Sequence, residues 1–187
     1  MSETTRDTLQ RLADRAEIQD ALCRYARAVD RGDWDLLRTT YHPDAYDDHF
    51  DYKGDLEGLV RFLDERFAGA DNSTHFLGNC LIEFGGIDVA LAETYFASRR
   101  LRAPSSDERE ALQPGDMICR QSWGRYLDRF ERRNGDWRVA RRVVALESRF
   151  TSVARQGARD SRSTWGARDD SDLLYTMRAE ILGGKSR

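Results

Sequence analysis

The pair Asn134-Gly135 constrains the fold more than any other feature of the sequence. It separates two long segments, residues 117–133 and residues 136–150, that are both predicted to be strands. Asn-Gly is the preferred pair for the tight turn that joins two antiparallel strands. The sequence therefore predicts a long β-hairpin over residues 117–150.

A second strand pair is predicted just before this hairpin. Residues 73–84 and 87–101 favour strands, and Gly85-Gly86 stands between them as a turn. Residues 103–116 form a polar stretch that is typical of a loop. Four long strands joined in sequence order favour an antiparallel sheet.

The chain upstream of these strands is predicted to be helical. Ile18, Leu22, Tyr25 and Val29 recur at steps of four, three and four, which favours an amphipathic helix over about residues 6–30, extended upstream by Leu9 and Leu12. A short helix over residues 34–41 is expected to end at His42-Pro43, because the residue before proline avoids the helical region. A third helix is predicted over residues 55–69, after a polar aromatic stretch, and a fourth over residues 170–182.

Helices followed by long antiparallel strands indicate an α+β fold. A curved sheet wrapped by the N-terminal helices would form a cone with a pocket inside. We predict one domain over residues 1–150 and a C-terminal extension over residues 151–187 that carries a short helix.

Composition excludes several classes of partner. The net charge of −3 comes from mixed charges without a basic block, which disfavours nucleic acid. No apolar run approaches the roughly 20 residues of a membrane span, and the polar N-terminus lacks the apolar core of a signal peptide. Three widely spaced cysteines, Cys23, Cys80 and Cys119, are expected to be buried free thiols in a cytoplasmic protein.

Asp30 and His75 are the candidate acid–base pair. Asp30 stands at the end of the first helix, where the negative pole of the helix dipole disfavours a carboxylate. If it faces a cavity and accepts a hydrogen bond from an imidazole, it fixes the tautomer of that ring and raises its basicity. The alternatives are a surface carboxylate paired with Arg27 or Arg31 and an ordinary buried histidine.

Strand alternation predicts the surroundings of His75. It places His75, Leu77, Asn79 and Leu81 on one face and Phe76, Gly78, Cys80 and Ile82 on the other. If the first face lines the cavity, His75 is an imidazole in an apolar pocket.

Two further residue types could support such a pair. Arg141 and Arg142 are adjacent in the last long strand, so only one of them can point inward, where it could stabilise a developing negative charge. Tyr25 stands five residues before Asp30, about 140° around the helix, and is otherwise an ordinary core aromatic.

A metal site is the weaker interpretation. Asp47, Asp48 and His49 could be ligands, although their spacing matches no known metal cage and acidic loops are usually solvated. The sequence contains no GxGxxG, no P-loop, no GxSxG and no HExxH motif. We therefore expect neither a cofactor nor a bound metal.

Three segments together resemble the SnoaL-like family of the NTF2-like superfamily. They are "RLADRAEIQDALCRYARAVDRGDWDLL", "STHFLGN" and "RYLDRFERRNGDWRVARRVV", within residues 8–150. Lindane dehydrochlorinase, scytalone dehydratase and bile acid 7α-dehydratase are members of that group. The resemblance implies a cone-shaped α+β fold, often dimeric or trimeric, with a cofactor-free site inside the cone.

The resemblance also implies roles for four residues. The aspartate of the family's dyad corresponds to Asp30, its histidine to His75 and an active-site arginine to Arg142. Tyr25 matches a tyrosine of the bile acid enzyme where the dehydrochlorinase has a lysine, which favours the polarising of an oxygen over dehalogenation.

These residues favour a cofactor-independent lyase of the dehydratase type acting on a hydrophobic small molecule. His75 would remove a proton beside a carbonyl, Asp30 would orient it, and Tyr25 and Arg142 would bind the oxygen that gains charge. The alternatives are a ketosteroid-isomerase or polyketide-cyclase type of reaction, and a ligand-binding or assembly module without turnover.

Overall fold

The computed structural model describes residues 3–155 and 160–183, which form helices and one sheet. The elements in chain order are α1 (Glu3–Arg31), α2 (Trp34–Arg38), β1 (Tyr41–His49), β2 (Tyr52–Asp55), α3 (Leu56–Phe67), β3 (Ala70–Phe84), β4 (Val89–Arg102), α4 (Ser106–Arg109), β5 (Asp116–Arg133), β6 (Asp136–Arg155) and α5 (Leu173–Leu182).

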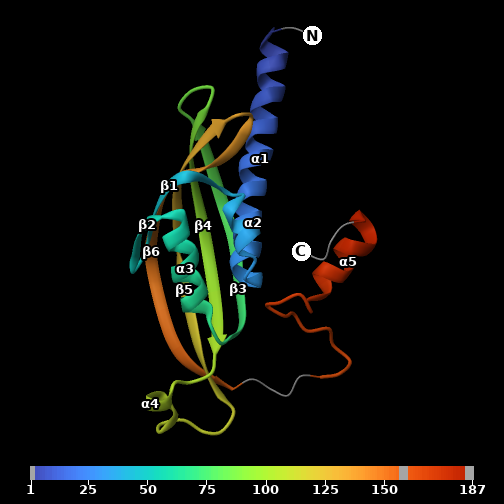
Figure 1. Cartoon of the computed structure of the whole chain (residues 1–187). Coiled ribbons are helices and arrows are strands. Elements are labelled where there is room, and N and C mark those ends of the chain that lie inside the picture. The colour runs from blue at the N-terminus through green and yellow to red at the C-terminus, as the bar shows by residue number, and fades with distance from the viewer. Residues whose placement is uncertain (1–2, 156–159, 184–187) are drawn as a thin grey trace.

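The sheet is mixed and open, with strand order β2-β1-β6-β5-β4-β3. β1 runs parallel to β6, and every other neighbouring pair is antiparallel. The predicted hairpin is confirmed: β5 and β6 pair along their lengths, and the turn residues Asn134 and Gly135 both have positive φ angles. Figure 1 shows the long, curved strands with α1 along one side and α3 in front.

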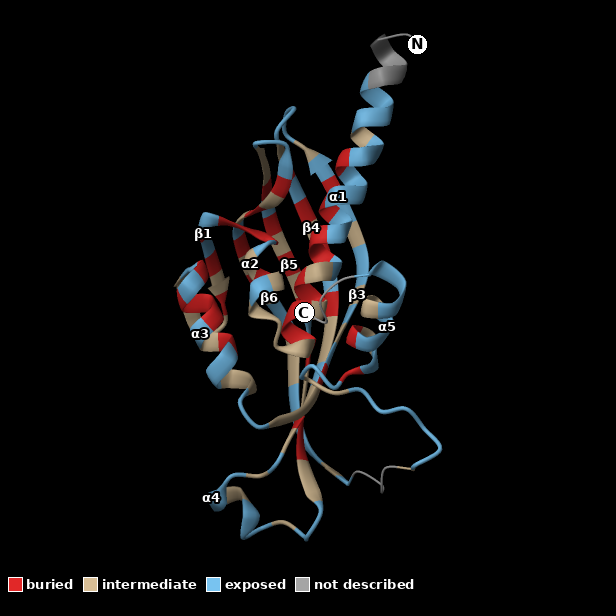
Figure 2. Ribbon diagram, turned by 45° about the vertical axis from the view of Figure 1, so that its right-hand side comes forward, coloured by how far each residue is buried: buried red, intermediate tan, exposed pale blue. Residues whose placement is uncertain are grey.

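The core lies between the helices and the sheet. The predicted stripe of α1, Ile18, Leu22, Tyr25 and Val29, is almost fully buried, and α3 adds Leu59 and Leu63. The N-terminal part of α1 extends beyond the sheet, so Leu9 and Leu12 are exposed rather than part of this core (Figure 2). Burial of apolar surface along the stripe therefore holds the C-terminal half of α1, and with it Asp30, against the sheet.

The segment after α1 differs from the prediction. The short helix ends at Arg38 instead of continuing to residue 41. The hydroxyl of Thr40 donates to the carbonyl of Leu37, and the Thr40 carbonyl accepts from the amide of Val139 in β6. These bonds direct the chain toward the sheet. The polar aromatic stretch before the third predicted helix therefore forms β1 and β2.

The strict alternation predicted for β3 is wrong beyond Leu77. Leu77 pairs with Phe96 and Cys80 with Thr94, so β3 carries one extra residue at this point. The bulge moves Cys80 and Ile82 to the inner face that holds His75 and leaves Leu81 exposed. The pocket face of β3 therefore keeps His75 and Leu77 but gains Cys80 and Ile82.

The remaining predictions have mixed outcomes. The cysteines are free, but only Cys119 is buried, whereas Cys23 is exposed. β6 continues past residue 150 to Arg155, and α5 lies where the fourth helix was predicted. The division into a domain of residues 1–150 and an extension of residues 151–187 stays a prediction. Within the described ranges, no helix is both long and apolar enough to cross a membrane.

Candidate active site

Asp30 and His75 are hydrogen-bonded in the structure. Asp30 ends α1, His75 lies early in β3, and His75 Nδ1 is 2.7 Å from Asp30 Oδ1. The amide of His75 donates to Asp30 Oδ2 at 2.7 Å, and the hydroxyl of Ser73 donates to Oδ1 at 2.9 Å. A carboxylate can only accept, so Nδ1 carries the proton and Nε2 keeps its lone pair.

The C-terminal segment compensates the helix end that carries Asp30. The Arg168 guanidinium donates to the carbonyls of Val29 and Asp30 at 3.0 and 2.9 Å. A cation at the C-terminus of a helix offsets the negative pole of the helix dipole. Gly32, with a φ of +65°, ends the helix in the left-handed conformation. Together these features let a carboxylate occupy a position that the dipole disfavours.

A small pocket adjoins the dyad, and the centre of a water-sized sphere can occupy about 40 Å³ of it. It lies between α1, α3 and the inner face of the sheet. The backbone register aligns His75, Ser98, Ser122 and Arg149 in one row across β3, β4, β5 and β6. Two of these four side chains are small serines, which leave room on the sheet for a ligand beside His75.

Tyr25 lines this pocket, and its hydroxyl is buried from solvent. The residue is 1% exposed, lines the pocket, and makes no hydrogen bond through its hydroxyl within the described part of the chain. Burial raises its pKa, and the nearby charge of Arg142 opposes that rise only in part. Tyr25 is therefore protonated at neutral pH, and its hydroxyl is a buried donor beside the pocket.

Arg142, rather than Arg141, points inward, but it lies beneath the pocket. Its guanidinium forms two hydrogen bonds with Asp128, at 2.7 and 2.6 Å, and is sandwiched between the rings of Tyr25 and Tyr126 at 4.1 and 4.2 Å. Arg142 and Asp128 are both fully buried, and Arg141 is exposed. The arginine thus supports Tyr25 from behind instead of lining the pocket.

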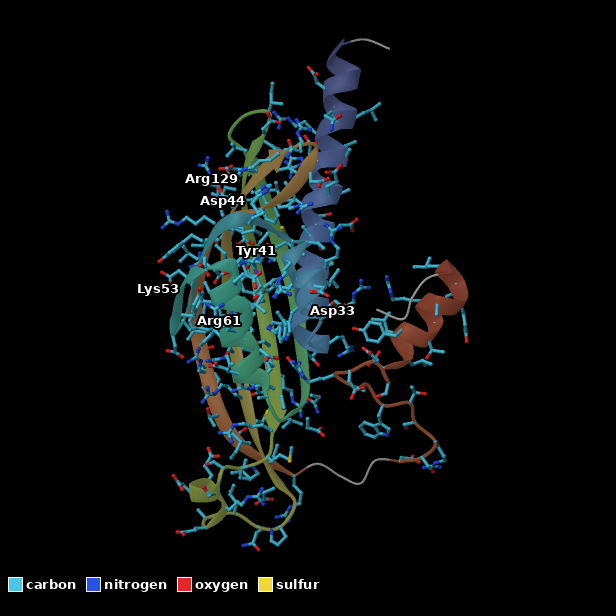
Figure 3. All side chains as sticks on the ribbon, viewed as in Figure 1. Asp33, Tyr41, Asp44, Lys53, Arg61 and Arg129 are labelled. Carbon is cyan, nitrogen blue, oxygen red and sulfur yellow. The ribbon has the colours of Figure 1, made fainter. Side chains whose placement is uncertain are left out.

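The sequence interpretation missed His49 as part of this site. His49 lines the pocket, and its Nδ1 lies 3.4 Å from Asp47 Oδ1. Asp47 also accepts a 2.7 Å hydrogen bond from Tyr41, a residue of the packed interior, whereas Lys53 lies on the edge strand β2 (Figure 3). The position of His49 depends on how β1 pairs with β6, which no local pattern indicates.

The structure does not support a metal site at Asp47, Asp48 and His49. Asp48 pairs with Lys53 at 2.8 Å and is not directed at His49 or Asp47. In the part of the chain that the structure describes, no group of three or more His, Cys, Asp or Glu side chains is arranged to hold a metal ion.

The hydrogen bond between Asp30 and His75 should make the stability of the fold depend on pH. Burial raises the pKa of Asp30, but the hydrogen bonds and charge of His75 outweigh it and bring the pKa below its ordinary value of 3.8. Because the pKa of Asp30 is lower in the folded state than in the unfolded chain, ionised Asp30 stabilises the fold at any pH above the pKa of the unfolded state. This stabilisation is lost as the pH falls through the pKa of the folded state. We expect Asp30→Asn to cost about 1–3 kcal/mol near neutral pH.

The difference in unfolding free energy between wild type and Asp30→Asn should begin to shrink below about pH 4, where Asp30 takes up a proton in the unfolded chain, and should be lost as the pH falls through the lower pKa of the folded state. Urea titrations between about pH 3 and pH 7 measure it. A difference that stays constant over this range would contradict the assigned role of the ionised carboxylate.

A family model and several known proteins match most of the chain. The SnoaL-like domain family matches residues 10–143. Uncharacterised proteins of Mycobacterium tuberculosis and Mycobacterium bovis are 30% identical to the chain over 138 residues, which cover 71% of this chain and 84% of each of theirs.

Solved structures resemble the chain over most of its length. A hexachlorocyclohexane dehydrochlorinase from Novosphingobium barchaimii is 20% identical, with a TM-score of 0.64 over 82% of this chain and 99% of that one. A scytalone dehydratase-like protein from Novosphingobium aromaticivorans is 14% identical, with a TM-score of 0.64 over 81% and 93%. At these identities the similarity shows the fold, and it confirms the predicted cone.

Proposed function

This chain belongs to the SnoaL-like domain family, and from that premise we propose that it is a cofactor-independent lyase of the dehydratase type. The observation that carries the proposal is the 2.7 Å hydrogen bond between Asp30 and His75 Nδ1 beside a pocket that Tyr25 also lines. Two proteins of the same fold are described as a dehydrochlorinase and a scytalone dehydratase-like protein. Their names favour an elimination as the class of reaction.

The proposed reaction begins with His75. Its Nε2 takes a proton from a carbon next to a carbonyl, and the electron pair left behind forms the new double bond. Asp30 orients the ring and stabilises the imidazolium that forms. The bond from the next carbon to its hydroxyl group breaks, and the hydroxyl leaves as water with the proton that the His75 imidazolium returns from Nε2, so His75 is neutral again.

Tyr25 supplies the hydrogen bond that this chemistry requires. Negative charge develops on the carbonyl oxygen as the proton leaves, and a preorganised donor in a buried site stabilises that charge. Arg142 acts as a positioning residue, because its guanidinium stacks on the Tyr25 ring and is held by Asp128. Val29, Leu63 and Phe67 give the pocket apolar walls that suit a hydrophobic substrate.

A panel of hydrophobic β-hydroxy ketones in D₂O tests the proposal. We expect loss of one water from at least one ketone, followed by mass spectrometry, and deuterium at the carbon beside the carbonyl, followed by NMR. Deuterium incorporation or rearrangement without loss of water would instead indicate the isomerase or cyclase type of reaction. If ketones bind but undergo neither deuterium exchange nor conversion, the protein is a binding module and not a lyase.

We also propose that the chain forms a dimer or trimer, as the family resemblance implies. Large apolar side chains are exposed on the outer side of the long strands, among them Phe76, Leu91, Tyr95 and Phe150. Their burial between subunits would remove apolar surface from water. Light scattering that gives the mass of a single chain would contradict this proposal.

A further inference from the structure

Arginines gather on the inner face of the sheet beside His75. Arg149 ends the row that begins with His75, and Arg100 and Arg120 are paired with each other in the adjacent row of β4 and β5. Arg100 and Arg120 line the pocket, and Arg149 lies over the ring of Phe50, which lines it too, at 4.6 Å. We call Arg100, Arg120 and Arg149 the arginine cluster.

The arginine cluster lacks acidic partners. Within the described residues none of its members forms an ion pair, and the Nε and Nη2 atoms of Arg149 are buried without a hydrogen-bond partner. Burial and the charges of Arg66 and Arg120 lower the pKa of Arg100 to about 10. The three arginines are half-buried, and cations withdrawn from water are normally paired, so this arrangement favours the binding of a negative charge.

Phe50, which lies beside the arginine cluster, has a strained backbone conformation. Phe50 has a φ of +61°, a left-handed conformation that is unfavourable for a bulky side chain. Arg100 lies 5.1 Å from the Phe67 ring. Strained residues persist when the surrounding structure determines them, and they concentrate at ligand sites. The cluster therefore combines apolar surface with positive charge in a single wall.

We propose that the arginine cluster binds an anionic group of the substrate, a carboxylate or a phosphate monoester, while the dyad acts on a carbon farther along the same molecule. This inference rests on the proposed function. Guanidinium groups match the oxygens of both anions through paired hydrogen bonds. An anion bound at Arg100 and Arg120 would compensate the like charges around Arg100.

The register also limits the shape of the substrate. Neighbouring strands are about 4.8 Å apart, so the backbones of His75 and Arg149 are separated by three spacings, roughly 14 Å, along one row. The long arginine side chain shortens the gap, and Ser98 and Ser122 leave it open. The substrate is thus a hydrophobic acid in which a ring system separates the acidic group from the reacting carbon.

Calorimetric titration with three probes of similar shape tests the inference. The probes are 1-naphthoate, 1-naphthyl phosphate and the neutral 1-naphthalenemethanol. We expect at least one anion to bind about tenfold or more tightly than the alcohol, because hydrogen bonds between charged groups are strong. The preferred anion identifies the acidic group, and its affinity should fall with added salt. Equal affinity for all three probes would overturn the inference.

Variants of the cluster localise the effect. Arg120→Gln and Arg149→Gln should each weaken anion binding by about 10- to 100-fold and leave the alcohol unchanged. Arg141→Gln, at an exposed position of the same strand as Arg149, is the matched control and should leave both unchanged. Both cluster variants relieve like-charge repulsion, so we expect them to fold, and thermal melts verify this. Anion binding that survives in both variants, or that falls equally in Arg141→Gln, contradicts the inference.

The experiment separates this inference from the proposed function. His75→Ala should abolish deuterium exchange but keep the affinity for the naphthyl anions. Exchange on neutral ketones without preference for anions would refute the arginine cluster alone. Anion binding without exchange on any ketone would refute the lyase and support the cluster.

Discussion

Replacing Asp30 by asparagine is expected to lower turnover about 10²–10⁴-fold, the range for loss of general base catalysis. The amide of asparagine can donate to Nδ1 of His75, which would place the ring proton on Nε2 and remove the lone pair that takes the substrate proton. His75→Ala should be at least as damaging, since it removes the base itself. Deuterium exchange followed by NMR gives both rates.

Asp20→Asn is the matched control for this prediction. Asp20 lies on the same helix but is exposed, so its change should leave the rate unaffected. Circular dichroism checks that Asp30→Asn and His75→Ala remain folded. Full activity in either variant, with the fold intact, would refute the assigned dyad.

Replacing Arg142 by methionine is expected to destabilise the fold by about 3–5 kcal/mol, which is the typical cost of breaking a buried ion pair from one side. Asp128 is fully buried, and burial raises its pKa although Arg142 opposes the rise. Without the guanidinium, Asp128 would have to be buried as an unpaired charge or take up a proton. Chemical denaturation at neutral pH measures the loss.

Two further variants make this prediction specific. Arg142→Met combined with Asp128→Leu removes both charges and should recover most of the stability, because well-packed apolar residues can replace a buried ion pair. Arg141→Gln, one residue away but exposed, should change stability by no more than about 0.5 kcal/mol. An Arg142→Met protein as stable as Arg141→Gln would show that the pair contributes little.

The elements of this fold were largely predictable because their signals are local. The stripe from Ile18 to Val29 and the pair Asn134-Gly135 each act within a few residues, through helical periodicity and turn geometry. The same local positions, a helix end and the start of a strand, marked Asp30 and His75 as candidates. β1 and β2 were missed because the pairing of β1 with β6 and of β2 with β1, rather than a pattern of their own, makes them strands.

The tertiary structure decided what surrounds the candidate site. One extra residue between Leu77 and Cys80 changed which side chains share the face of His75, and only the pairing of β3 with β4 places that bulge. The burial of Arg142 against Asp128 and the row that joins His75 to Arg149 likewise depend on strand register.

The sequence by itself therefore determined the helices, the hairpins and the residues able to do acid–base chemistry, since each depends on neighbours along the chain. The structure alone decided that Asp30 meets His75 across 45 positions, that Arg142 lies beneath Tyr25, and that Arg100 and Arg120 line the same pocket as His75. Side-chain direction alternates along a strand. Register decides which residues of different strands lie side by side, and register results from packing the whole sheet.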